Sequence, residues 1–315
     1  MPLLLLTEND VSRLLKMPEA IEVMEEAFGQ LAAGLAMNVP RERARAPGIV
    51  LHSMSAAAEY LGLVGWKQYT TTARGARFHV GLYDQDSGEL VALIEANRLG
   101  QMRTGAVSGL AAKYLAVPTA RAVGLFGSGW QAESQLAAIH AVCPLERAWV
   151  YSRDATRREK FAARMSAELR LEVLPAEEPR QAVAGLPIVV TATTSRQPVF
   201  DGSWLEPGAL VCAIGSNWRE KAEIDVTTVS RASDIVCDSV ACCQHEAGDF
   251  TQPFEQGKFT WDQATELADV VTGKTTGRTN LDSIVVFKSV GMAIEDVALA
   301  GRLMKKLAPS RYPRG

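Results

Sequence analysis

Residues Ala122–Ala132 read Ala-Val-Gly-Leu-Phe-Gly-Ser-Gly-Trp-Gln-Ala, and this stretch decides the fold. An apolar strand runs directly into the glycines, and a helical pattern begins at once after them. The first glycine permits a tight turn, the second lets the backbone approach a pyrophosphate, and the small Ala132 lets the helix lie close to the strand. Unpaired N–H groups at the helix start would face the negative charge. The residues predicted to bind a dinucleotide are therefore Gly127, Ser128, Gly129, Trp130, Gln131 and Ala132.

The composition is typical of a globular protein and gives no sign of a nucleic-acid or membrane partner. The 315 residues suggest about two domains, and 47% hydrophobic residues suffice for ordinary cores. The net charge is −3, no apolar run approaches the roughly 20 residues that span a bilayer, and the start lacks the basic segment of a signal peptide. The five cysteines include no Cys-x-x-Cys pair, and Cys242, Cys243 and His245 have poor spacing for zinc. We expect reduced thiols, a cytoplasmic protein and no metal site.

Beyond Pro118, predicted strands and helices alternate along the chain. Such alternation is typical of a parallel, doubly wound sheet, so we predict a Rossmann domain here. Its predicted strands lie at 123–126, 148–151, 171–173, 188–192, 210–214, 235–237 and 284–287, with helices at 131–142, 156–169 and 181–184. A long final helix is predicted at 290–307. The first third predicts a separate α+β domain. Its elements are helical residues 9–35 divided at Pro18, strands at 62–72, 77–83 and 89–96, and a helix at 100–115.

The end of the second Rossmann strand should distinguish NAD from NADP. An acidic residue there would hold both ribose hydroxyls of NAD, but this chain has Ser152 at that place. Arg153 and Arg157 could pair with a 2′-phosphate, with Ser152 and Thr156 as hydroxyl donors. The pattern favours NADP(H). If the strand ends later than expected, Asp154 could be the acidic residue that binds the ribose of NAD(H). The alternative for Arg153 and Arg157 is that they are solvent-exposed residues at the start of a helix.

Several cationic residues upstream are candidate handles for an anionic substrate. Arg41, Arg43 and Arg45 recur at period two, so in a strand they share one face. Arg103 stands at the predicted start of a helix, where its guanidinium adds to the positive helix terminus and suits a carboxylate. Lys67 lies mid-strand among apolar neighbours, where a lowered pKa would let it transfer a proton. For each residue alone, a surface charge or structural ion pair is the alternative.

Taken together, these motifs resemble the ornithine cyclodeaminase/μ-crystallin family, in family order and over most of the chain. They are Pro40-Arg41, Gly65-Trp66-Lys67, Arg103-Thr-Gly-Ala106, Gly127–Ala132, Ala213-Ile-Gly-Ser-Asn217, and Phe287-Lys-Ser-Val-Gly291 before Glu295-Asp296. The resemblance implies a homodimer whose substrate-binding and dimerisation domain spans 1–117 with 292–315, and whose Rossmann domain spans 118–291. It also implies that Lys67 and Arg103 bind the substrate carboxylate, assisted by Arg41, with Arg43 as the competitor. The further cofactor residues that it implies are Thr193, Ser216, Lys288, Ser289 and Gly291.

One position departs from the family pattern. Cyclodeaminases and alanine dehydrogenases carry an aspartate where this chain has Asn217, and an amide cannot act as a base. Ornithine cyclisation is therefore disfavoured, whereas reduction of a C=N bond needs less from that position. We place Asn217 among the substrate-binding residues, and we read Glu223 and Asp225 as mainly structural.

The resulting functional prediction is an NAD(P)H-dependent reductase of α-imino acids, with Lys67 as the proton donor. The alternatives are an oxidative L-amino-acid dehydrogenase of the alanine dehydrogenase type, an ornithine cyclodeaminase, and a crystallin-like NADPH-binding protein with little turnover. His52, Trp66 and Tyr69 are candidates for the pocket of the substrate side chain, with core packing as the alternative. Short, acidic, basic and cyclic imino acids all stay open. Arg45 or Arg74 near the pocket would favour a second acid group.

Overall fold

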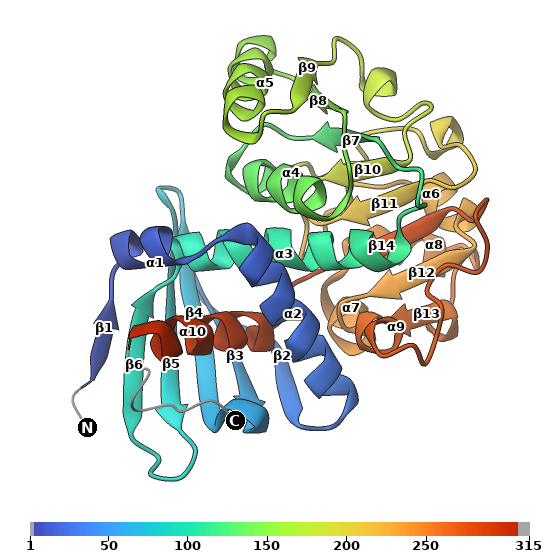
Figure 1. Ribbon diagram of the computed structural model, residues 1–315. Helices are drawn as coiled ribbons and strands as arrows, with labels where there is room; N and C mark the ends of the chain where they lie inside the picture. Colours follow the sequence, from blue (N-terminus) through green and yellow to red (C-terminus); the bar gives the residue numbers. More distant parts are fainter. Residues whose placement is uncertain (1–2, 308–315) are drawn as a thin grey trace. The chain divides into compact units, whose positions relative to one another are not determined.

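The computed structural model describes residues 3–307, which are divided between two compact units (Figure 1). Among the described residues, unit 1 comprises 3–104 with 291–307, and unit 2 comprises Gly105–Val290. Over residues 3–307, no helix has the length and apolar character needed to cross a membrane. The mixed α/β class predicted from the sequence is confirmed.

Unit 1 is built on a six-stranded sheet with the order β1-β6-β5-β4-β3-β2. Its neighbouring strands are antiparallel, except that β1 runs parallel to β6. The strands are β1 (Leu4–Leu6), β2 (Ala36–Ala46), β3 (Ile49–Ala58), β4 (Leu63–Thr72), β5 (Gly75–Asp84) and β6 (Leu90–Glu95). The helices are α1 (Glu8–Leu14), α2 (Met17–Ala32), the short η1 (Glu59–Leu61), the start of α3 (Asn97–Leu115), and α10 (Ala293–Leu307).

Helix α10 covers one face of this sheet, which we call the inner face. It packs on β2, β3, β4 and β5 and also against α2, and Figure 1 shows it lying across the strands. Alternate residues of β3 and β4 are buried on the inner face, as the two-residue strand period requires. Gly65 lets α10 approach β4 closely, because a Cβ on Gly65 would lie only 2.8 Å from a methyl carbon of Val297 in α10.

The first two helices divide slightly earlier than expected. Helix α1 is closed at its start by a capping box between Thr7 and Asp10, and it ends at Leu14. Helix α2 begins at Met17 with Pro18 in its first turn, where the missing N–H of proline has no helical partner to lose. The proline therefore starts the second helix and does not end the first.

Unit 2 contains an eight-stranded parallel sheet with the order β13-β12-β14-β11-β10-β7-β8-β9. Its strands are β7 (Ala122–Phe126), β8 (Arg147–Tyr151), β9 (Glu172–Pro175), β10 (Ile188–Thr191), β11 (Leu210–Ala213), β12 (Asp234–Cys237), β13 (Ala264–Glu266) and β14 (Val285–Lys288). The helices are α4 (Trp130–Val142), α5 (Ala155–Leu169), η2 (Pro179–Ala182), η3 (Gly202–Trp204), α6 (Val226–Arg231), α7 (Val240–Glu246), η4 (Gly248–Phe250), α8 (Thr251–Glu255), η5 (Trp261–Gln263) and α9 (Leu267–Val271). Their connectivity confirms the predicted Rossmann fold.

The strand order gives this sheet a topological switch point. From β7 the chain continues to β8 and β9 on one side, then returns to β10 on the other side of β7. The carboxyl ends of β7 and β10 therefore form the topological switch point, which is where open α/β sheets hold their ligands. Gly127 follows β7 and Thr193 follows β10, so the predicted cofactor residues start from this point.

The two units divide inside helix α3. Gly105 belongs to unit 2, where a Cβ on it would lie 2.4 Å from the carbonyl oxygen of Ser134 in α4. This tight packing associates the second half of α3 with unit 2 from that residue on. The domain boundaries expected from the sequence, after residues 117 and 291, would instead keep the whole of α3 in the first domain. That division of the chain into domains stays a prediction.

Candidate functional site

Four charged side chains of unit 1 form one buried cluster. Lys67 Nζ donates to both carboxylate oxygens of Asp296, at 2.8 and 3.0 Å, and its side chain is 1% exposed. Arg103 Nη1 donates to Glu295 Oε2 at 2.7 Å, and its Nε lies 3.3 Å from Asp296 Oδ2. Both acids are fully buried. We call these four residues the charge cluster.

Three elements carry the residues of the charge cluster. Lys67 lies on the inner face of β4, Arg103 lies in α3, and both acids lie in the first turn of α10. The start of α10 is held by Asn38 of β2, whose Oδ1 accepts from the backbone N–H groups of Ala293 (2.8 Å) and Ile294 (3.3 Å). Such a cap satisfies N–H groups that a helix start leaves without partners. The acids are therefore fixed against the sheet.

Arg103 does not stand at a helix start, so that prediction was wrong. Helix α3 begins at Asn97, six residues before Arg103, because Glu8 accepts from the backbone N–H groups of Asn97 and Arg98 and thereby opens the helix earlier. A helix terminus acts over only the first turn. The partners of the Arg103 guanidinium are instead the acids of α10.

The charge cluster gives Lys67 an unusual acidity. Burial disfavours its charged form, the Arg103 guanidinium acts in the same direction, and Asp296 opposes both. The net result lowers the pKa of Lys67 to about 8. An ammonium with such a pKa is still protonated at neutral pH, yet it releases its proton far more readily than a solvent-exposed lysine.

Arg41 joins the charge cluster through a bulge in β2. The register of β2 against β3 shifts between Val39 and Glu42, and β2 is an edge strand, where Pro40 is tolerated. Arg41 is buried, and its Nη2 donates to the carbonyl oxygen of Gly291 at 3.3 Å. Gly291 has φ +81°, and a Cβ there would lie 2.5 Å from Arg103 Nη1, so only glycine fits between the two guanidinium groups.

Arg43 takes a different partner on the inner face. Its Nε donates to His52 Nδ1 at 3.2 Å, and the His52 ring stacks on Tyr69 at 4.1 Å between ring centroids. Arg41 and Lys67 each lie 6.0 Å from the centroid of the same tyrosine ring. The structure thus brings Arg41 and Lys67 to Tyr69, and Arg43 to the His52 ring that stacks on it.

The glycine turn of unit 2 has the geometry that a dinucleotide requires. Gly127 has φ +111°, and a Cβ there would lie 2.4 Å from the carbonyl oxygen of Ala192. Gly129 faces open space, since nothing lies within 4 Å of a Cβ built on it. It is the N-cap of α4 without a side-chain cap, and Ala132 is fully buried in that helix. The open N-terminus of this 13-residue helix fits a pyrophosphate.

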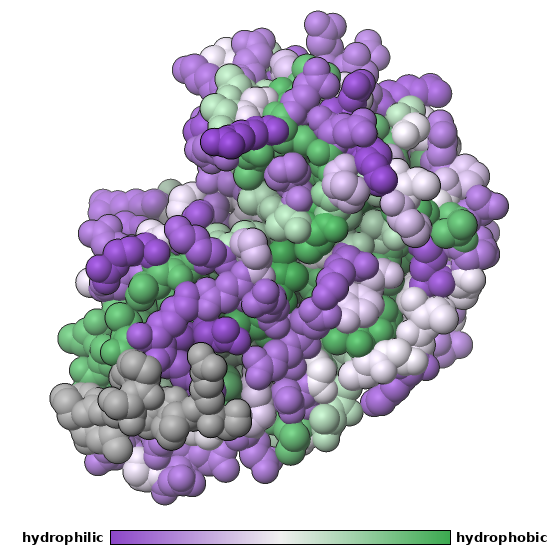
Figure 2. Space-filling view, viewed as in Figure 1, coloured by the Kyte–Doolittle hydropathy of each residue, from purple (hydrophilic) through white to green (hydrophobic). Residues whose placement is uncertain are grey.

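The end of β8 lies beside this turn. Strand β8 ends at Tyr151, and Ser128 Oγ donates to Ser152 Oγ at 3.0 Å. Asp154 is the N-cap of α5, because its Oδ1 accepts from the backbone N–H of Arg157 at 3.0 Å. The strand therefore does not continue to an acidic residue. Figure 2 shows a largely hydrophilic surface over α5, and Arg153 and Arg157 are both exposed there.

A buried network fixes the loops that follow β10 and β11. Glu223 accepts from Thr191 Oγ1 (3.0 Å), the backbone N–H of Thr193 (2.6 Å), Thr193 Oγ1 (2.5 Å) and the backbone N–H of Gly215 (2.6 Å). Burial and the neighbouring Asp249 raise the pKa of Glu223. The Glu223 carboxylate accepts all four of these hydrogen bonds and thereby links the loop after β10 to the loop after β11. This arrangement agrees with the structural role expected of Glu223. Asp225 likewise caps α6, accepting from Thr228 N at 2.7 Å.

Lys288 belongs to the same network. Its Nζ lies 2.7 Å from Asp249 Oδ2 and donates to the carbonyl oxygen of Ser216 at 2.7 Å, with the side chain fully buried. Although burial lowers the pKa of Lys288, the pairing with Asp249 raises it above the usual value. The ammonium thus supports the loop that carries Ser216. The assignment of Lys288 to the cofactor site stays a prediction.

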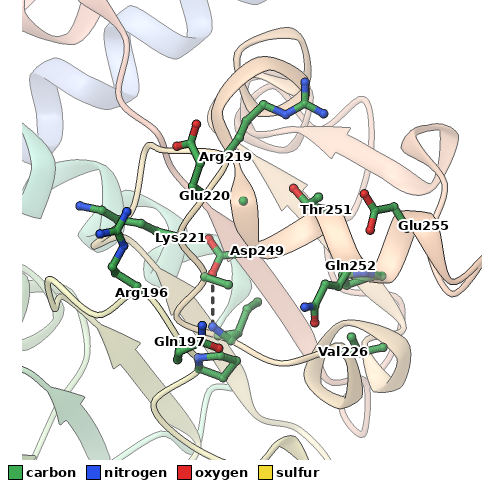
Figure 3. Close-up of a pocket in the computed structure, with 15 residues that line it drawn as sticks. Arg196, Gln197, Arg219, Glu220, Lys221, Val226, Asp249, Thr251, Gln252 and Glu255 are labelled. Atoms are coloured by element: carbon green, nitrogen blue, oxygen red, sulfur yellow. Dashed lines mark hydrogen bonds between the residues drawn. The ribbon is translucent and has the colours of Figure 1, made fainter.

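Asp249 also lines a pocket in unit 2 (Figure 3). Its Oδ1 accepts from the backbone N–H groups of Glu223 (2.6 Å) and Ile224 (3.2 Å). Figure 3 shows Arg196 and Lys221 extending together on one side of this pocket, with Thr251, Gln252 and Glu255 on the opposite side. The mixed charges select no single class of ligand.

The sequence analysis did not predict which acidic residues pair with Lys67 and Arg103. Glu295 and Asp296 were noted only as a landmark of the family, although two adjacent acids at the start of an apolar helix were a visible signal. Asp238 was missed as well. It accepts from Ser289 Oγ (2.7 Å) and the backbone N–H of Val290 (2.8 Å), so Ser289 also has a supporting contact. Asn217 is half-buried in the loop after β11.

Comparison with known proteins places this chain in a family. The pattern of the ornithine cyclodeaminase/mu-crystallin family matches residues 2–309. The structure of Thermococcus litoralis Delta(1)-pyrroline-2-carboxylate reductase in complex with NADH and L-proline is 33% identical, covers 98% of both chains and superposes with a TM-score of 0.92. The probable ornithine cyclodeaminase from Bordetella pertussis Tohama I is 32% identical over 100% of both chains, with a TM-score of 0.94. The alanine dehydrogenase of Archaeoglobus fulgidus is 31% identical and covers 95% of this chain and 94% of its own. The chain therefore belongs to the ornithine cyclodeaminase/mu-crystallin family.

Proposed function

We propose that this protein reduces α-imino acids to L-amino acids with a reduced nicotinamide dinucleotide. The observation that carries this proposal is the buried Lys67, with a pKa near 8, beside Arg103 and Arg41. Paired guanidinium groups bind a carboxylate with two charge-assisted hydrogen bonds. The relative that was solved with L-proline and NADH handles a product of this kind.

Each residue then has a defined task. Arg103 and Arg41 orient the substrate carboxylate, which places the adjacent C=N carbon for attack. The hydride for that carbon would come from the reduced nicotinamide when the cofactor is bound. Lys67 donates its Nζ proton to the imine nitrogen, so that the C=N double bond becomes a CH–NH single bond. Asp296 keeps the ammonium in place and raises its pKa toward the working pH.

Asn217 favours reduction over the oxidative alternatives. Deamination and cyclisation need a base that activates water or an amine, and a carboxamide has no such basicity. The loop that carries Asn217 is held by Lys288 and Glu223, which are both committed to structural contacts. An oxidative amino-acid dehydrogenase is the second candidate, favoured by the likeness to alanine dehydrogenase.

For the cofactor, we place the pyrophosphate at Gly127–Gly129 and the start of α4. We also propose a preference for NADP(H), with NAD(H) as the weaker alternative. The Thermococcus relative was solved with NADH, so this preference rests on the residues of this chain. Support comes from Ser152 directly after β8, from the use of Asp154 as a helix cap, and from the exposed Arg153.

We further propose that two copies assemble through the outer face of the unit 1 sheet. Met37, Ala57, Val64 and Tyr83 pair in one row across β2, β3, β4 and β5, opposite to the inner face. Met37 is 59% exposed, Val64 is 41% exposed and Tyr83 is 36% exposed. A continuous apolar row of this kind on a sheet face is typical of a protein interface.

The reaction is tested by substituting the proton donor. Lys67→Met keeps an unbranched apolar stem but has no proton to give, so we expect its kcat for imine reduction to fall roughly 100-fold or more. The assay follows oxidation of NADH and NADPH with pyrroline-2-carboxylate and with pyruvate plus methylamine. Gln68→Met, on the other face of β4, should keep the parent rate. A Lys67→Met protein with full activity would remove Lys67 from the mechanism.

The cofactor site is tested by two variants with different expected effects. Gly129→Val fills the open space that we assign to the pyrophosphate, so its Kd should rise for NADH and NADPH alike while its thermal stability is kept. Arg153→Ala should raise only the Kd for NADPH, about tenfold, because it removes a charged partner of the 2′-phosphate. Fluorescence titration measures both constants, with Lys160→Ala of α5 as the control. Equal losses for the two cofactors in Arg153→Ala would contradict the NADP preference.

Oligomeric state is tested by light scattering coupled to size-exclusion chromatography. The parent should have twice the mass of one chain, and Val64→Arg should shift it to one chain, because a charge in an apolar interface lacks a partner. Leu281→Arg alters an apolar residue of unit 2 that is still more exposed, at 66%, and should stay dimeric. A monomeric parent, or a dimer that survives Val64→Arg, argues against this interface.

A further inference from the structure

Two residues of β2 that a regular strand would place on opposite faces both reach the start of α10. They are Asn38 and Arg41, which are three positions apart, and side chains of a regular strand alternate between its faces. The register of β2 against β3 shifts between Val39 and Glu42, so a bulge separates the two residues. Asn38 and Arg41 therefore both face inward, and both contact the segment 291–294.

The two acids of α10 lie between two points at which this helix is fixed to the sheet. Asn38 Oδ1 accepts from the N–H groups of the first two helical residues, at 2.8 and 3.3 Å. About one turn later, Val297 packs against Gly65, which has no side chain to keep the helix away. Glu295 and Asp296 lie between these points. Loss of the Asn38 contact should therefore loosen the first turn, while the rest of α10 stays packed on the sheet.

The position of this first turn matters because Asp296 supports the charged form of Lys67. Burial and the guanidinium groups of Arg103 and Arg41 disfavour the ammonium, whereas Asp296 favours it through its charge and its hydrogen bonds. That support requires close contact, since both Nζ–O distances, 2.8 and 3.0 Å, are those of hydrogen bonds. A displaced first turn would therefore make Lys67 more acidic.

Other titratable or charged groups near Lys67 come from several elements. They are Tyr69 of its own strand, His52 of β3, Arg41 and Arg43 of β2, Arg103 of α3, and Glu295 and Asp296 of α10. On the neighbouring strands β3 and β5, the residues paired with Lys67 are the uncharged Met54 and Val80. The two acids of this set are both carried by the turn that Asn38 holds.

We propose that Asn38 is a positioning residue for the proton transfer, because it holds the start of α10 and thereby keeps Asp296 in contact with Lys67. This inference rests on the proposed function, since it concerns the proton donor assigned there. Asn38 acts through the backbone of Ala293 and Ile294. The bulge of β2 then serves two ends, because it lets one short segment hold the helix and also direct Arg41 inward.

The test measures kcat/KM for pyrroline-2-carboxylate reduction as a function of pH in Asn38→Ala and Asn38→Asp. The alanine lacks the acceptor, so Lys67 should lose its proton earlier, and the alkaline fall should move to lower pH by roughly one unit. The aspartate keeps an oxygen at the same reach, and a negative charge suits a helix start. Its fall should therefore stay at the parent pH or move higher.

Asp84→Ala is the matched control in unit 1. Asp84 Oδ1 accepts from the backbone N–H of Ser87 at 2.9 Å, in the turn after β5, so this variant also loses a bond from a side chain to the backbone. It should melt at a lower temperature than the parent and keep the alkaline fall in place. If Asn38→Ala does not fold, Asn38→Ser replaces it, because its shorter side chain cannot reach both N–H groups and should move the fall in the same direction.

The outcomes separate a positioning role from a merely structural one. A folded Asn38→Ala or Asn38→Ser protein that melts lower but keeps the parent pH profile would overturn the inference. A fall moved to lower pH in Asn38→Asp would overturn it as well, since that variant keeps the acceptor. If the parent reduces no imine, or shows no alkaline fall, the proposed function itself fails, with Lys67 as its proton donor.

Discussion

The pairing of two buried carboxylates with two buried cations is the interaction on which unit 1 depends. Glu295 and Asp296 begin the last helix of the chain, and they hold Arg103 and Lys67 from two distant segments. A buried ion loses hydration, so removal of any one member would leave a costly unpaired charge. The cap from Asn38 fixes the start of this helix. The same pairing thus ties the sheet to α10 and sets the acidity of Lys67.

Unit 2 also contains a buried ion pair, which supports loops at the carboxyl ends of its strands. Asp249 pairs with Lys288 and also receives the backbone of Glu223, whose carboxylate in turn binds the loops after β10 and β11. The loop after β10 begins at the topological switch point, where open α/β sheets hold their ligands, and the loop after β11 begins at the next strand of the sheet. Lys288 and Glu223 hold the backbone of the loop that carries Gly215 and Ser216.

Local patterns in the sequence predicted the parts of the molecule that depend on local physics. The turn Gly127–Ala132, the parallel alternation and the strand around Lys67 follow from glycine conformations and strand period. The start of α3 was missed because Glu8, 89 residues from Asn97, opens that helix. The bulge at Arg41 and the partners Glu295 and Asp296 were missed for the same reason. These features depend on contacts between segments that are distant in the sequence, and the periodicity of neighbouring residues does not reveal such contacts.

We propose that Lys67, whose pKa is raised by Asp296, donates the proton. The most direct measurement is the pH dependence of kcat/KM for pyrroline-2-carboxylate reduction, compared between the parent and Asp296→Asn. The free-enzyme acid governs this profile, so the parent value should fall above about pH 8 as Lys67 loses its proton. Asp296 raises the pKa of Lys67, so its neutralisation should move the fall to lower pH, while the titration of the imine stays fixed. An identical fall in both proteins, or no fall up to about pH 10, would contradict the account.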